Sequence, residues 1–170
     1  MLPDQYRRRK NSYRKPGHDY NQPARYFITI ETINMVCMFG HVENGIVYLN
    51  KFGLLAEKFW KNIPSLYINV VLDAFIVMPN HLHGIIIITD TAACIERSIK
   101  PPSLSDIVRR YKASTTRAIN YLQHTGGESI WKQNYHDRII PDKITLNAPR
   151  IYIQNNPLKW NASAWPDRDD

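Results

Sequence analysis

The sequence predicts an α+β fold in which an antiparallel β-sheet carries helices on one face. Short β-branched runs are interspersed with segments whose apolar residues recur at helical spacing. Asn44-Gly45 marks a two-residue hairpin turn, which joins antiparallel strands. With 170 residues and 44% hydrophobic content, the chain is long enough for one domain with a substantial core.

The first half of the chain is expected to hold a strand, a hairpin and a helix. "RYFITIET" (25–32) alternates and is β-branched, which is typical of a strand. A short strand at 46–49 follows the hairpin turn. Apolar residues at helical spacing predict a helix from Phe52 to Ile63, and Pro64 is expected to end it.

Three further strands are expected in the second half. "LYINVVLDAFIVM" (66–78) is predicted to form a long strand, and Pro79-Asn80 interrupts it. "HLHGIIIIT" (81–89) then begins its antiparallel neighbour, followed by a linker at 91–101. "IWKQNYHDRII" (130–140) is expected to be a turn followed by a short strand.

Two helices complete the pattern. The first is capped by Ser103 or Ser105 and runs to about Gln123 with one apolar stripe. The second is expected to start near Leu146 or Ala148, to run through "RIYIQNNPLKW" and to be ended by Pro157. The order β-β-α-β-β-α-β-α fits a ferredoxin-like plait.

The plait is expected to occupy residues 25–160, between a basic N-terminal arm (1–24) and a short tail (161–170). Cys37 and Cys94 form neither a disulfide framework nor a Cys-x-x-Cys motif. The basic N-terminus is not followed by the apolar region of a secretory signal. Because no apolar run approaches the ~20 residues that span a bilayer, we expect a cytoplasmic protein without a membrane partner.

Positive charge is concentrated in two stretches. The net charge is +7, and the first 20 residues hold six Lys and Arg against two Asp. A second cluster lies in "IVRRYKASTTR". Clustering of this kind suits a polyanion, although a solvated basic surface has the same composition. The candidate phosphate-binding residues are Arg7, Arg8, Arg9, Lys10, Arg14, Lys15, Arg109, Arg110, Lys112 and Arg117.

Two histidines interrupt the apolar run "FIVMPNHLHGIIII". In a strand, residues i and i+2 share a face, so His81 and His83 project together while Leu82 points into the core. Two imidazoles at that spacing can converge on one cation. The alternative is a pair of solvent-facing histidines, because a bare His-x-His pattern is short and frequent by chance.

A cation held by two imidazoles needs a third protein ligand. The C-terminal helix offers Tyr152 and Asn156, which stack on one helical face at i, i+4 spacing. The amide of Asn156 can complete a facial set of ligands, and water or phosphate oxygens at the remaining positions favour Mg²⁺ or Mn²⁺. Periodicity alone does not separate Tyr152 from Tyr111, Tyr121 or Tyr135.

Four motifs in order give the chain a family resemblance. "VMPNHLHGIIII", "LSDIVRRYKASTTRAIN", "IWKQNYHDRII" and "YIQNNPLKW" resemble the REP-associated tyrosine transposases and their insertion-sequence relatives. "DYNQPARYFITIET" and "FGHVENGIVYLNKFG" are similar to the front half of that family. The resemblance covers about residues 13–160.

The resemblance implies a single-tyrosine endonuclease of the histidine–hydrophobic–histidine type. It implies that His81 and His83 bind the metal, that Asn156 is the third ligand, and that Tyr152 is the nucleophile. The implied substrate is single-stranded or hairpin-forming DNA, at repetitive extragenic elements or transposon ends. The insertion-sequence relatives act as dimers and the REP-associated branch can act as a monomer, so the oligomeric state stays open.

Aromatic residues near the basic clusters are candidates for stacking on unpaired bases. Tyr6, Trp131 and Tyr135 are the candidates, with Trp131 expected in the core. Packing within the protein is the alternative for each of them.

Three positions depart from the family pattern. Pro141 stands where the family commonly has arginine, and Ile151 replaces a commonly acidic neighbour of the tyrosine. Pro149 lies three residues before Tyr152, which a helix tolerates only in its first turn. Two rival functions are a non-catalytic module that binds hairpin DNA or RNA, and a metal-dependent hydrolase that uses activated water.

Overall fold

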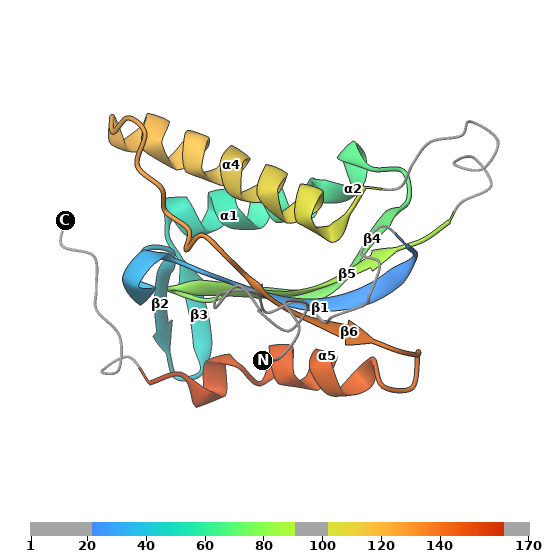
Figure 1. Ribbon diagram of the computed structural model, residues 1–170. Helices are drawn as coiled ribbons and strands as arrows, with labels where there is room; N and C mark the ends of the chain where they lie inside the picture. Colours follow the sequence, from blue (N-terminus) through green and yellow to red (C-terminus); the bar gives the residue numbers. More distant parts are fainter. Residues whose placement is uncertain (1–21, 91–101, 162–170) are drawn as a thin grey trace, which may run out of the picture.

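The computed structural model describes residues 22–90 and 102–161 and contains a four-stranded antiparallel sheet (Figure 1). Its strands lie in the order β4-β5-β1-β6. Helix α1 lies between β1 and β4 along the chain, and α4 lies between β5 and β6, which gives the βαββαβ order of the ferredoxin-like plait. The predicted fold class is confirmed. The strands are β1 (Ala24–Glu31), β4 (Val70–Val77), β5 (His81–Ile88) and β6 (His136–Ile140).

A separate hairpin is inserted between β1 and α1, after the short 3-10 helix η2 (Ile33–Met35). It pairs β2 (Gly40–Glu43) with β3 (Ile46–Leu49). Asn44 and Gly45 both have positive φ angles, 51° and 74°, as the two central residues of a tight hairpin turn require.

Helices α1 (Lys51–Lys61) and α4 (Leu104–Gln123) cover one face of the sheet (Figure 1). Ser103 caps α4 in a capping box with Asp106, which selects it over Ser105. Helix α1 ends two residues before the predicted boundary. Pro64 lies in the first turn of a further short helix, α2 (Ile63–Leu66), where a proline is tolerated.

The main core lies between these helices and the sheet. It includes Ile28 and Ile30 of β1, Leu82 of β5, and Trp60 of α1, all fully buried. A Cβ atom on Gly84 would collide with the Trp60 ring. Glycine in this isoleucine-rich strand therefore makes room for the tryptophan.

The opposite face of the sheet carries α5 (Asn147–Gln154) and the 3-10 helix η3 (Pro157–Lys159) (Figure 1). A smaller apolar cluster joins α5 to the sheet and contains Ile85, Ile140, Leu146 and Ile153. Pro149 is the third residue of α5 and so lies in the first turn, where it does not break the helix. The helix ends at Gln154, slightly earlier than predicted, and Pro157 begins η3.

Three of the expected segments fall outside the described residues. These are the part of the N-terminal arm that holds its six basic residues, the linker at 91–101 and almost all of the tail.

The predicted strand at 66–78 starts four residues later than expected, at Val70. Within residues 22–90 and 102–161, none of the helices has the length and apolar character needed to cross a membrane.

Candidate active site

The two histidines of β5 lie on the face of the sheet that carries α5. Their ring centroids are 4.6 Å apart, at an interplanar angle of 69°. Leu82 between them is fully buried in the core on the other face. The predicted alternation along the strand is therefore what brings the imidazoles together.

Each imidazole is oriented by a hydrogen bond at Nδ1. His83 Nδ1 lies 2.8 Å from Thr29 Oγ1, and Thr29 is the residue directly opposite on β1. His81 Nδ1 lies 2.7 Å from Asn80 Oδ1. The Asn80 amide nitrogen donates to the Met35 carbonyl at 3.0 Å, so its oxygen faces the ring and accepts from Nδ1. His81 is thereby left with its lone pair on Nε2, the atom that can bind a cation.

Burial keeps both histidines neutral. It lowers the pKa of His81 to about 4, against the opposing effects of a side-chain hydrogen bond with Asn156 and the negative charge of Glu31. Burial, and then the nearby His81, lower the pKa of His83 to about 3. A metal-binding imidazole must be unprotonated, and these two are unprotonated at neutral pH.

Tyr152 on α5 lies beside this pair. Its ring centroid is 5.2 Å from that of His83, and the rings meet edge to face at 71°. Phe27 contacts both rings, at 5.8 Å from Tyr152 and 5.4 Å from His83. The Tyr152 side chain is 43% exposed, so a phenol held by aromatic contacts is still accessible to a substrate.

Asn156 completes the group. It follows α5 in helical conformation (φ −59°, ψ −43°), which preserves the i, i+4 relation to Tyr152. Its side chain is buried and hydrogen bonds with His81. Tyr152, Asn156 and both histidines, four residues from two distant segments, are thus brought together.

The donor set fits a divalent cation. Two neutral imidazoles and an amide oxygen are compatible with Mg²⁺ or Mn²⁺ when oxygen ligands from water or phosphate are added. In the part of the chain that the structure describes, no three His, Cys, Asp or Glu side chains are grouped to hold a metal. A site here therefore depends on the amide of Asn156.

Several residues around the site were not foreseen. Glu31 lies opposite His81 in the β1–β5 register, and its carboxylate binds Lys132 Nζ at 2.8 Å. His136 Nε2 lies 3.9 Å from the same carboxylate. Alternation along β1 places Thr29 and Glu31 on one face, but the sequence does not reveal which strand they oppose.

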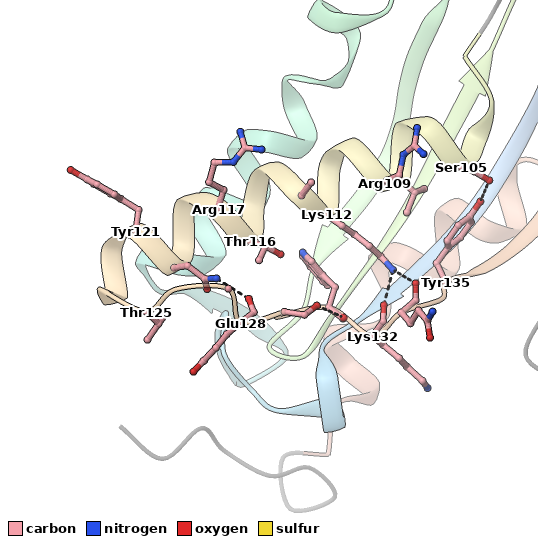
Figure 2. A pocket seen from close by; sticks show the side chains of 17 residues that line it. Ser105, Arg109, Lys112, Thr116, Arg117, Tyr121, Thr125, Glu128, Lys132 and Tyr135 are labelled. Atoms are coloured by element: carbon pink, nitrogen blue, oxygen red, sulfur yellow. Dashed lines mark hydrogen bonds between the residues drawn. The ribbon is translucent and has the colours of Figure 1, made fainter.

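The basic residues of α4 lie on the other face of the sheet, away from α5 (Figure 1). Arg109, Lys112 and Arg117 border a cavity of about 840 Å³ between α4 and residues 125–135 (Figure 2). Arg109 forms an ion pair with Asp106 at 2.7 Å, Arg110 lies over the Tyr67 ring at 6.0 Å, and Arg117 lines the cavity.

The ammonium group of Lys112 binds backbone carbonyls of the protein itself. Its Nζ donates to the carbonyl oxygens of Lys132, Asn134 and Gln133 at 2.8, 2.9 and 3.3 Å. Burial lowers its pKa to about 8. The ammonium of Lys112 is thus directed toward residues 132–134 (Figure 2), and its contact with DNA stays a prediction.

Of the aromatic candidates for base stacking, Trp131 and Tyr135 are among the described residues, and they differ in exposure. Trp131 is buried, as expected, and its Nε1 donates to Thr115 Oγ1 at 2.7 Å. Tyr135 lines the cavity beside α4, with its hydroxyl 3.2 Å from Ser105 Oγ and its ring 5.8 Å from Lys112 Nζ. Tyr6 lies outside the described residues.

The fold is that of the REP-associated tyrosine transposases. The structure of one such transposase bound to a REP hairpin superposes with a TM-score of 0.62, covering 90% of this chain and 81% of that one at 18% identity. An uncharacterized protein of Haemophilus influenzae (strain Rd) is 34% identical over 163 residues, which cover 89% of each chain. The chain belongs to the same family as that protein. No protein-family model matches it.

Proposed function

We propose that the protein is a transposase-type endonuclease and strand transferase for single-stranded DNA at hairpin-forming repeats. The observation that carries the proposal is the contact of Tyr152 with the His81–His83 pair, at 5.2 Å between the Tyr152 and His83 rings. The fold shared with a transposase bound to a REP hairpin supports DNA of this kind as the substrate.

The Tyr152 oxygen would attack the scissile phosphorus. A bond from the phenol oxygen to phosphorus forms, and the bond from phosphorus to the 3′-oxygen breaks. The phenol releases its proton to solvent, and the leaving oxygen takes up a proton to become a 3′-hydroxyl. The product is a 5′-phosphotyrosine, so a later 3′-hydroxyl can reverse the step and join a different strand without ATP.

His81, His83 and Asn156 would hold one Mg²⁺ or Mn²⁺ ion, which supplies Lewis-acid stabilisation of the charge on the scissile phosphate. The surrounding side chains position the two imidazoles and the phenol. Thr29 and Asn80 fix the two rings through Nδ1. Phe27 and His83 hold the Tyr152 ring edge-on, which limits the rotation of the phenol.

A denaturing gel tests this function. Labelled single-stranded hairpin DNA with unpaired flanks of random sequence is incubated with the protein and Mn²⁺. We expect a covalent protein–DNA band that is lost with EDTA and in Tyr152→Phe. Tyr48→Phe is the matched control, because Tyr48 is an exposed tyrosine on β3.

Other outcomes would replace the proposal. Free cleaved ends without an adduct would indicate a hydrolase that uses activated water. Intact DNA that is bound regardless of EDTA would indicate a non-catalytic hairpin-binding module. If a mixture of Tyr152→Phe and His83→Gln chains regains activity, the two halves of the site come from different copies of a homodimer.

A further inference from the structure

A second cavity lies directly beside Tyr152. Its volume is about 430 Å³, within the ~300–1,000 Å³ typical of small-molecule sites. Its walls are β6, the first turns of α5, and Phe27 and Thr29 of β1. It shares Tyr152 and Thr29 with the candidate active site, but both histidines of that site lie outside its lining.

The walls of this cavity suit a flat aromatic ligand. Phe27 and Tyr152 present two aromatic rings at 83° to each other, and Pro149 and Ala148 add an apolar side from α5. Aromatic surfaces of this kind stack on nucleobases with little sequence preference.

The remaining wall is β6, in which three polar residues, His136, Asp137 and Arg138, precede Ile139 and Ile140. Among the described strands, β6 is at the edge of the sheet, and all five of its residues line the cavity. An edge strand presents backbone N–H and C=O groups that can bind the hydrogen-bonding edge of a base. A cavity with two aromatic rings and one such edge matches a nucleobase better than an aliphatic ligand.

A positive charge lies next to the cavity. Arg138 is exposed and pairs with Phe27 in the β1–β6 register, so its side chain projects on the same face of the sheet. Asp137 also lines the cavity, but it pairs with Ile28, so alternation along β6 directs its side chain toward the opposite face of the sheet. Arg138 is therefore placed to neutralise a phosphate attached to a nucleoside in the cavity.

We propose that this cavity between β6 and α5 binds one unpaired nucleotide that adjoins the scissile phosphate, with the base among Phe27, Tyr152 and Pro149 and the phosphate near Arg138. The inference rests on the proposed function, because it assigns the site's substrate contact. It also explains how single-stranded DNA is positioned at Tyr152: a base must leave its stack to enter the cavity.

The test uses single nucleotides, so that it does not depend on cleavage. The Tyr152→Phe protein in EDTA is titrated with each of the four deoxynucleoside 5′-monophosphates, and methyl resonances of Ala148, Ile139 and Ile140 are followed by NMR. We expect at least one nucleotide to bind with a millimolar dissociation constant and to shift these signals. 2-Deoxyribose 5-phosphate should bind roughly 5- to 150-fold more weakly, because it lacks the stacking base.

Two variants of α5 provide the matched comparison. Ala148→Phe, in the same Tyr152→Phe background, fills the cavity and should abolish nucleotide binding. Ile151→Phe adds the same ring at a residue that is 47% exposed and outside the cavity lining, and should leave binding unchanged. Thermal unfolding of both variants verifies that they are folded.

Three results would overturn the inference: no shift of the three methyl signals by any nucleotide, equal binding of the sugar phosphate, or unchanged binding in Ala148→Phe. These results leave the proposed function intact if the wild-type protein still forms the Mn²⁺-dependent adduct. If nucleotide binding is seen and the adduct is not, the cavity is a nucleotide site and the proposed reaction fails.

Discussion

Arg150 and Asp73 join α5 to β4 through two parallel hydrogen bonds. Arg150 Nε lies 2.7 Å from Asp73 Oδ1, and Nη2 lies 2.6 Å from Oδ2. Asp73 lies where the β4–β5 register shifts between Leu72 and Phe75. The hydrogen bond from Arg150 holds the pKa of the Asp73 carboxyl below its usual value. This pair anchors α5 two residues before Tyr152.

Loss of this anchor is expected to misplace the phenol without disturbing the histidines. Asp73→Asn should lower the rate of adduct formation by roughly 10- to 100-fold, since small displacements of a reacting group have effects of this size. Mn²⁺ affinity, measured by isothermal titration, should fall as well, because Asn156 follows α5 and moves with Tyr152, while His81 and His83 stay in place on β5. Glu57→Gln removes an exposed ion pair with Lys61 on α1 and is the control. An unchanged adduct rate in Asp73→Asn would show that the pair does not position Tyr152.

The hydrogen bond of Thr29 to His83 is expected to support metal binding. Thr29→Val keeps the shape of the side chain but removes the partner of Nδ1. Loss of such a partner typically weakens metal binding by about 10- to 100-fold. We expect this loss for Mn²⁺, followed by electron paramagnetic resonance of the free ion. Thr145→Val, in a surface turn with Asp142, should bind Mn²⁺ like the wild type. Equal affinities for the two variants would show that the hydrogen bond from Thr29 does not support metal binding at His83.

The sequence alone predicted those features of the fold and the site that depend on interactions between residues close together in the chain. The capping box at Ser103, the positive φ angles at Asn44-Gly45 and the shared face of His81 and His83 each depend on residues within a few positions. The proximity of Tyr152 to the histidines was expected through the family resemblance, because periodicity alone left several tyrosines equivalent.

The remaining features depend on contacts between distant segments. Thr29 and Glu31 face the histidines only because of the β1–β5 register, which the sequence does not specify. Lys112 was predicted to contact DNA because it lies in a basic run, but its ammonium contacts carbonyls about 20 residues away. The cavity beside Tyr152 depends on β6 occupying the edge of the sheet next to β1.

The two histidines of β5 are expected to make the metal-free protein sensitive to acid. Their pKa values, about 4 and about 3, lie below the 6.5 of an unfolded histidine, so the unfolded state binds more protons below pH 6.5. The free energy of unfolding must then fall as the pH falls through this window. Each histidine should contribute about 2 kcal/mol of this loss between pH 7 and pH 5.

Urea unfolding in EDTA at a series of pH values measures this effect. His81→Gln should remove about half of the stability lost between pH 7 and pH 5, whereas His41→Gln, at an exposed position on β2, should retain the full loss. A pH dependence that is the same in His81→Gln and the wild type would mean that folding does not lower the pKa of His81.

Two basic residues of α4 are expected to respond differently to substitution. Lys112→Met removes three hydrogen bonds that fasten residues 132–134 to the helix, and should lower the free energy of unfolding by about 1–3 kcal/mol. Arg117→Gln should leave the free energy of unfolding within ~0.5 kcal/mol of the wild type, because no such hydrogen bond of Arg117 is found among the described residues. If α4 contacts DNA phosphates, Arg117→Gln should instead lower the slope of log affinity against log salt by about 1. Urea unfolding and fluorescence anisotropy with a labelled hairpin at several salt concentrations separate the two effects. A full salt slope in Arg117→Gln would remove Arg117 from the DNA-binding surface, and an unchanged stability in Lys112→Met would show that the three carbonyl contacts do not hold the turn.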